Sequence, residues 1–280
     1  SDPGETIMIP GIWTNYLHDL SPEETVETFS RKGWFALELS DEDGRALLQR
    51  GDPAAVGREF GRFAEDRGVS FPQGHLWLWV DVCGEDPQGA IDGVKRWLDL
   101  FAAIGIPAAV MHPGGKAMQE QGCSSKQIAA ANIEPLRELC DHAAGAGTTI
   151  CLENMYTYLP RVEDLLGIVD AVRRDNLAIC LDTGHLNIAG GDQAKFIRAA
   201  GRRLRAVHVA DNDGSGDQHL LPFSLGTVDW RATFAALKET GYDGLLSFEV
   251  PGETRCPLPV RLAKLDFIKT IWPVLLGHGW

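Results

Sequence analysis

The sequence predicts an α/β protein with a single domain, residues 1–280, folded as a (β/α)8 TIM barrel. Three observations lead to this prediction. Apolar segments rich in Ile, Leu, Val and Phe alternate with amphipathic segments along the chain, and about eight such pairs can be counted. Glycines stand where the amphipathic segments should end. A length of 280 residues, 44% of them hydrophobic, exceeds the usual size of one domain except in folds such as barrels.

The expected strands are near-continuous apolar runs, as in a parallel sheet that is covered on both faces. They are expected at residues 6–12, 34–39, 69–75, 107–112, 148–153, 177–182, 204–209 and 244–249.

The segments between these strands carry helix signals. Ser21-Pro22-Glu23-Glu24 offers an N-cap, a proline at the first helical position and early acidic residues. Most of the next strands are preceded by a glycine that suits a helix end, namely Gly33, Gly68, Gly105, Gly147, Gly201 and Gly241. No Gly-rich phosphate motif follows the first expected strand, which argues against an open nucleotide-binding sheet.

The charge of the chain restricts its partners. The formal net charge is −13, from 39 acidic and 26 basic residues, and no run of Lys or Arg forms a patch. Non-specific nucleic-acid binding comes mainly from neutralising phosphates, so we expect a small-molecule substrate and no nucleic acid. No apolar stretch approaches the roughly 18 residues of a membrane helix, so no membrane contact is expected.

Cysteine usage and the first residues indicate the compartment. The six cysteines contain no CxxC pair, and Cys151 and Cys180 lie inside expected strands, as reduced and buried thiols would. The start, SDPGETIMIPG, lacks the basic-then-apolar pattern of a signal peptide. We therefore expect a cytoplasmic protein. Whether it forms a homo-oligomer stays open.

Four expected strands in the second half of the chain carry a metal-binding residue at or near their ends. ICLE closes on Glu153, ICLD on Asp182 and LSFE on Glu249, while AVHV carries His208. Packing does not explain a charged residue at the end of a buried strand. In a closed parallel barrel the carboxyl ends of the strands converge, so these residues can surround one ion. The oxygen-rich set predicts a divalent metal such as Mn, Zn, Mg or Co.

The residues two positions before these four are all small: Cys151, Cys180, Ala206 and Ser247. Side chains alternate between the faces of a strand, so each small residue shares the inward face with its ligand and leaves it room. A satisfied polar residue at a strand end is the alternative for any one strand. Four occurrences together favour a metal site.

Other polar residues fall at or just after expected strand ends. The possible additional metal ligands are His75, His112, His185, Asp217 and His219. A lone His is more often a hydrogen-bonded structural residue, and His112 before Pro113 suits a turn cap. Five of the eight His share this placement, however, which favours function. His75, His112 and Glu38 are also candidates for substrate contact, with a structural role for Glu38 as the alternative.

Taken together, these motifs resemble the xylose-isomerase-like TIM-barrel superfamily, in particular the sugar phosphate isomerase/epimerase proteins. The resemblance runs over roughly residues 69–250. Its specific stretches are HPG at 112–114, CLEN at 151–154, LDTGH at 181–185, HVADNDGSGDQH at 208–219, the following LGTVDW, and FEV at 248–250. The order and spacing of these stretches are more specific than any one of them.

The resemblance implies a carbohydrate isomerase or epimerase. In ketose 3-epimerases the residues that match Glu153, Asp182, His208 and Glu249 hold one divalent ion, and the two Glu act as acid and base through an enediolate. His185 matches a family residue that contacts a substrate oxygen. One departure is that the epimerases carry an Arg six residues beyond the metal-binding His, where this chain has Gly214.

Two other activities fit the same residues. Endonuclease-IV-type abasic-site nucleases use nine ligands for three zinc ions, and residues of matching type stand here at all nine places: His75, His112, Glu153, Asp182, His185, His208, Asp217, His219 and Glu249. The net charge of −13 argues against DNA as the substrate of a phosphodiester hydrolase. An inosose-dehydratase-like lyase would use the four-residue site, and a barrel without turnover also stays open. Lys116 and Arg255 are candidates to meet an anionic group.

Overall fold

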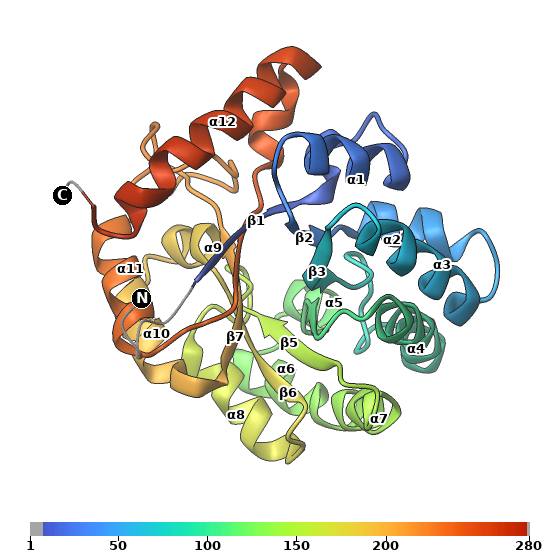
Figure 1. The fold of residues 1–280 in the computed structure, drawn as a ribbon. Helices are drawn as coiled ribbons and strands as arrows, with labels where there is room; N and C mark the ends of the chain where they lie inside the picture. The colour runs from blue at the N-terminus through green and yellow to red at the C-terminus, as the bar shows by residue number, and fades with distance from the viewer. Residues whose placement is uncertain (1–7, 279–280) are drawn as a thin grey trace.

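Eight parallel strands close into one barrel in sequence order in the computed structural model, which describes residues 8–278 (Figure 1). The strands are β1 (Ile9–Trp13), β2 (Ala36–Leu39), β3 (Ser70–His75), β4 (Ala108–Met111), β5 (Thr149–Glu153), β6 (Leu177–Asp182), β7 (Leu204–Val209) and β8 (Leu245–Phe248). The barrel closes where β1 pairs with β8, with Gly11 opposite Ser247. The predicted (β/α)8 TIM barrel is confirmed. Residues 6 and 7 of the first expected strand lie outside the described part.

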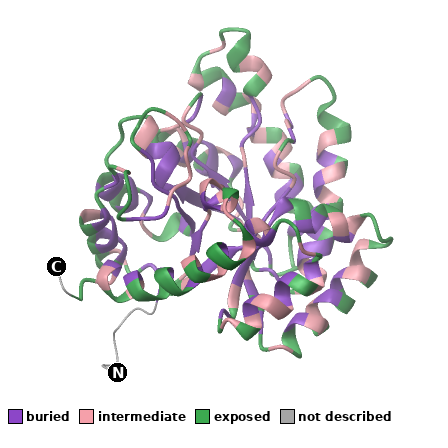
Figure 2. Cartoon of the chain, turned by 90° about the horizontal axis from the view of Figure 1, so that it is seen from above, coloured by how far each residue is buried: buried purple, intermediate pink, exposed green. Residues whose placement is uncertain are grey.

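Helices surround the barrel, and their outward faces carry most of the exposed residues (Figure 2). The α-helices are α1 (Pro22–Arg31), α2 (Asp41–Leu48), α3 (Pro53–Glu65), α4 (Pro87–Ile104), α5 (Lys116–Glu120), α6 (Ser125–Ala131), α7 (Ile133–Ala143), α8 (Val162–Val172), α9 (Thr183–Ile188), α10 (Gln193–Ala200), α11 (Trp230–Glu239) and α12 (Leu258–Leu275). Three short 3₁₀ helices are η1 (Thr14–Leu17), η2 (Gly201–Arg203) and η3 (Pro251–Arg255). No helix in residues 8–278 combines the length and apolarity that crossing a membrane requires.

The predicted helix signals have the expected local geometry. Ser21 and Glu24 form a capping box at the start of α1, in which each side chain accepts a hydrogen bond from the other residue's backbone N–H. Gly105 ends α4 with φ of 95°, in the left-handed region where other residues are strained. These signals place the helix boundaries and therefore the starts of the strands.

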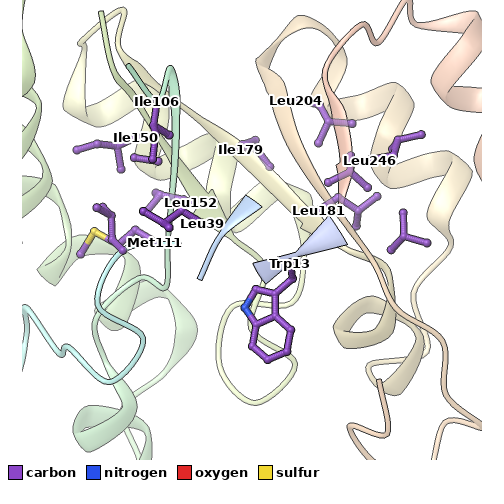
Figure 3. Packing of buried hydrophobic residues seen from close by; sticks show 14 of the residues in the cluster. Trp13, Leu39, Ile106, Met111, Ile150, Leu152, Ile179, Leu181, Leu204 and Leu246 are labelled. Atoms are coloured by element: carbon purple, nitrogen blue, oxygen red, sulfur yellow. The ribbon is translucent and has the colours of Figure 1, made fainter. Parts of the chain in front are cut away.

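The apolar core has two parts, because successive strand residues face opposite ways. Ile150, Leu152, Ile179 and Leu181 belong to the large cluster between the barrel and the helices (Figure 3). The second cluster fills the barrel interior with small residues: Ala108, Val110, Cys151, Ala178, Cys180 and Ala206. The small interior residues leave space at the carboxyl end of the barrel for larger polar side chains.

Candidate metal centre

The carboxyl ends of β5 to β8 bring the four predicted ligands into one group. Glu153, Asp182, His208 and Glu249 each offer one ligand atom, and these atoms lie within 4.8 Å of one another. His208 Nδ1 is 3.5 Å from Glu153 Oε1, 3.8 Å from Asp182 Oδ2 and 3.2 Å from Glu249 Oε2. Glu249 lies just beyond the end of β8 and is the most exposed of the four side chains, at 13%. We call this set the four-residue group.

The four-residue group fits a divalent cation. Glu153 Oε2, Asp182 Oδ2 and His208 Nδ1 are buried and have no hydrogen-bond partner among the described residues. Each unsatisfied buried polar atom costs about 1–3 kcal/mol, so a shared partner is needed. A cation bound by carboxylate oxygens and an imidazole nitrogen satisfies all three atoms at once. This donor set suits Mn, Zn, Mg or Co without selecting among them.

Hydrogen bonds around Asp182 position the ligands. The backbone N–H of Asp182 donates to Asn154 Oδ1 at 2.8 Å, which ties the end of β5 to the end of β6. Asp182 Oδ1 accepts from the backbone N–H of His185 at 2.6 Å as the N-cap of α9. The Thr183 hydroxyl donates to the Ala210 carbonyl at 2.7 Å, tying β6 to the segment after β7. Asn154 and Thr183 lie inside the CLEN and LDTGH motifs, but sequence reasoning did not single them out.

His208 has a second carboxylate partner, on the side of the ring away from the four-residue group. Its Nε2 lies 2.9 Å from Oε1 of Glu38 in β2, and both side chains are fully buried. Glu38 is absent from the described residues that line the cavity above the group. A contact between Glu38 and substrate therefore stays a prediction.

The five additional candidates surround the four-residue group. His75 Nε2 is 3.4 Å and His112 Nε2 is 3.5 Å from Glu153 Oε2. Asp217 Oδ2 lies 3.3 Å from His185 Nε2 and 3.0 Å from His219 Nε2. Two further metal-compatible groups result, His75 with His112 and Glu153, and His185 with Asp217 and His219. Glu153 is common to the first of these groups and the four-residue group.

The charged side chains of the site shift one another's pKa values. Burial opposes ionisation of Glu153, but the nearby His208 and His112 outweigh it and hold the pKa of Glu153 well below its usual range. Burial also opposes a charged His208, yet Glu38 and other acidic neighbours keep the pKa of His208 well above its ordinary value. Burial raises the pKa of Asp182 to about 7. A cation would replace protons that these residues otherwise share.

Cys180 lies beneath the four-residue group, as the alternation along β6 predicts. One ligand atom each of Cys180, Glu153 and His208 lies within 4.8 Å of the others. Burial holds the pKa of the Cys180 thiol well above its ordinary value. Because a neutral thiol is a poor ligand for a hard cation, we interpret Cys180 as a small neighbour that gives the ligands space.

A cavity of about 660 Å³ opens above the site. Glu153, His185, Asp217, His219 and Glu249 contribute to its floor and wall, together with His112. Its aromatic lining residues are Trp13, Trp79, Tyr156 and Tyr158. Trp79 is 72% exposed, which is unusual for a large aromatic residue. Trp77, two residues before Trp79, lines a different groove between α2 and α4.

The cavity carries an excess of negative charge. Six carboxylate residues line it: Glu42, Asp81, Glu120, Glu153, Asp217 and Glu249. Among the described lining residues, Lys116 is the only Lys or Arg, and it is exposed. Arg255, the other candidate for an anionic group, is not part of the lining.

The long segment between β7 and α11 is fixed by Asp211. Its carboxylate accepts hydrogen bonds from the backbone N–H of Asn212 at 2.9 Å, from that of Val228 at 3.1 Å and from Trp230 Nε1 at 2.8 Å. These hydrogen bonds to Val228 and Trp230 give the TVDW motif a structural role. They also hold the loop that carries Asp217 and His219 over the barrel mouth.

Comparison with known proteins agrees with this geometry. The sequence matches the family model for the xylose isomerase-like TIM barrel over residues 26–271. It is 35% identical to an L-ribulose 3-epimerase of Methylomonas sp. (strain DH-1) over 180 residues, covering 61% of this chain and 60% of that protein. It is 29% identical to a ketose 3-epimerase of Arthrobacter globiformis, covering 61% of this chain and 59% of that protein. The chain thus spans about three fifths of these relatives.

A solved structure with the same fold is that of a D-psicose 3-epimerase in the presence of D-fructose. The TM-score is 0.78, and the match covers 97% of this chain and 100% of that chain at 18% sequence identity. At this identity the match shows the fold alone.

Proposed function

This chain belongs to the xylose isomerase-like TIM barrel family, and we propose that it is a divalent-metal-dependent carbohydrate isomerase or epimerase. The observation that carries the proposal is the four-residue group, in which three carboxylates meet the unpartnered His208 Nδ1 and two of them, Glu153 and Glu249, line the cavity above. The 3-epimerases among the relatives support this class of reaction.

Glu153 and Glu249 are the proposed acid and base. When bound, the ion supplies a Lewis acid that polarises a substrate carbonyl and acidifies the adjacent C–H. Both side chains approach His208 Nδ1, Glu153 from β5 and Glu249 from beyond β8. Burial opposes ionisation of Glu249, but His208 and His219 lower the pKa of Glu249 to about 2. One carboxylate accepts the proton to give an enediolate, and the other, after it has taken up a proton from solvent, returns that proton at the same or the adjacent carbon.

His185 is proposed to hold a substrate oxygen. Its Nδ1 donates to the Asn154 carbonyl at 2.9 Å, which fixes the ring at the cavity wall, and its Nε2, whose contact with Asp217 Oδ2 is longer at 3.3 Å, is the nitrogen that would turn to a substrate oxygen. Burial opposes a charge on the ring, but Asp182, Asp217 and Glu153 hold the pKa of His185 well above its ordinary value. A fixed, protonated ring is a strong hydrogen-bond donor.

The proposed substrate is an uncharged carbohydrate. The described lining holds six carboxylates against Lys116 and the two His whose pKa is raised, His185 and His219, so even with one divalent ion the cavity offers no net positive charge to a phosphate dianion. Aromatic residues such as Trp79 and Tyr156 offer apolar faces to the C–H groups of a sugar ring. We therefore expect unphosphorylated sugars to react faster than their phosphates.

A phosphodiester hydrolase with a multinuclear zinc site is the second candidate, because three metal-compatible groups meet at this mouth. The acidic cavity and the net charge of −13 favour the carbohydrate enzyme over a nuclease.

The test is proton exchange at a substrate carbon in heavy water, followed by proton NMR with the metal-loaded enzyme and L-ribulose or D-psicose as probes. We expect Glu153→Gln and Glu249→Gln each to slow exchange by about 10²–10⁴-fold, the usual contribution of a general acid or base. Glu120→Gln is the matched control, because Glu120 is an exposed carboxylate at the rim of the same cavity. Full exchange in both Glu153 and Glu249 variants would overturn the two-carboxylate mechanism.

A further inference from the structure

We infer that Glu38 is a positioning residue that sets the tautomer and orientation of His208 for the cation. The inference rests on the proposed metal site and adds a residue to it from the opposite half of the barrel. Oε1 of Glu38 in β2 lies 2.9 Å from Nε2 of His208 in β7, and neither side chain is exposed.

The hydrogen bond determines which nitrogen of His208 is available. A neutral imidazole has one N–H donor and one nitrogen with a free lone pair. A carboxylate accepts hydrogen bonds only, so Glu38 holds the N–H of His208 on Nε2. When a cation displaces the proton on Nδ1, this atom carries the lone pair, and it faces Glu153, Asp182 and Glu249 without a hydrogen-bond partner. Glu38 therefore prepares the nitrogen that the four-residue group needs.

A purely structural role explains Glu38 poorly. Burying a carboxylate is costly unless it is paired, and the only ion-pair partner of Glu38 among the described residues is His208. Its second oxygen, Oε2, has no hydrogen-bond partner among those residues. The interior around it is otherwise built of small, mostly apolar residues such as Val110, Cys151 and Ala206. An apolar side chain at position 38 would pack at lower cost but would leave His208 Nε2 without an acceptor.

Gln73 on the neighbouring strand is a second buried polar side chain beside Glu38. Gln73 is the register partner of Glu38, and it too is fully buried. Neither atom of its side-chain amide has a hydrogen-bond partner within the described chain, and Glu38 Oε2 has none either. The hydrogen bond to His208 is therefore the one that the Glu38 side chain makes among the described residues.

The test measures metal affinity, which a merely structural residue would not change. We expect Glu38→Leu, which removes the acceptor with little change in side-chain volume, to weaken Mn²⁺ binding by about 10–100-fold in isothermal titration, as loss of a ligand's hydrogen-bond partner typically does. Glu38→Gln, whose amide oxygen can still accept from Nε2 of His208, should recover part of that loss. Glu65→Gln is the control, because Glu65 is an exposed carboxylate of α3 outside the cavity, and it should bind Mn²⁺ like the wild type. Mn²⁺ affinity within twofold of the wild type in Glu38→Leu would overturn the inference.

A second measurement needs no variant at position 38. Long-range proton–nitrogen NMR of the wild-type protein with one equivalent of Cd²⁺ should show His208 protonated on Nε2 and bound through Nδ1. A proton on Nδ1 would overturn the inference even if the Glu38 variants failed to fold. If the wild type bound neither Mn²⁺ nor Cd²⁺, the proposed metal-dependent function would fail first, so the two failures are distinguishable.

Discussion

The two halves of the barrel contribute to the site in different ways. The strands β5 to β8 each deliver one member of the four-residue group. The strands β2 to β4 deliver residues that approach this group from one side, with Glu38 at His208, and His75 and His112 at Glu153. In the proposed assignment, the second half therefore supplies the metal ligands, while Glu38 of the first half orients one of them and the two His of the first half are the candidates for binding further ions.

The largest effect should follow removal of a ligand from the second half. Asp182→Ala is expected to weaken Mn²⁺ binding by more than about 100-fold, beyond the roughly 10–100-fold typical of an outer hydrogen-bond partner. Activity should fall with it, because Asp182 Oδ2 is a proposed ligand atom with no hydrogen-bond partner among the described residues. Isothermal titration measures the affinity, with Asp213→Asn as a control on an exposed residue of the loop after β7. Unchanged Mn²⁺ affinity would remove Asp182 from the ligand set.

A smaller effect is expected in the first half. His112→Asn should leave the metal content at one ion per chain and change Mn²⁺ affinity by less than about tenfold, because His112 reaches the group only through Glu153. Elemental analysis of the variant beside the wild type measures this. If the variant instead lost ions that the wild type holds, His112 would be a ligand of an additional metal. Both halves of the barrel would then supply metal ligands.

Rising pH should lower the stability of the metal-free protein and raise its affinity for Mn²⁺. Burial opposes charged His75 and His219, but Glu153 raises the pKa of His75 to about 9 and Asp217 raises the pKa of His219 to about 9, from an ordinary 6.5. Raised pKa values stabilise the metal-free fold below pH 6.5, and this stability is lost as pH rises towards about 9.

Metal binding must displace the same protons, so Mn²⁺ affinity should increase over that range. Urea unfolding of metal-free protein at several pH values, with Mn²⁺ titrations alongside, measures both trends. If the free energy of unfolding and the Mn²⁺ affinity changed in the same direction with pH, these His residues would not share protons with the metal site.

The smallest effect is expected for a substitution that loosens the segment between β7 and α11, in the second half of the barrel. Trp230→Phe removes the hydrogen bond from Trp230 Nε1 to Asp211 and leaves a buried carboxylate oxygen with one partner fewer. We expect it to lower the free energy of unfolding by about 1–3 kcal/mol more than Trp34→Phe does. Trp34, just before β2, is also buried, but its Nε1 has no hydrogen-bond partner within the described chain. Equal losses in urea unfolding would mean that packing alone explains Trp230.

The sequence predicted the second half of the barrel better than the first. Charged residues that close apolar runs mark strand ends, so the meeting of Glu153 and Asp182 at the barrel mouth could be predicted from the pattern of residues alone, while their role as ligands stays a prediction. The role of Glu38 could not be predicted, because β2 and β7 are not neighbours in the sheet and only barrel closure brings Glu38 to His208. Asn154 was missed for a related reason, since its partner Asp182 is on another strand.

The central claim is that the four-residue group holds one divalent ion. Elemental analysis of protein purified without chelators tests it most directly. We predict one divalent ion per chain in the wild type and none in Asp182→Ala. Three zinc ions per chain would contradict the single-ion site, and protein without bound metal would contradict the metal site altogether.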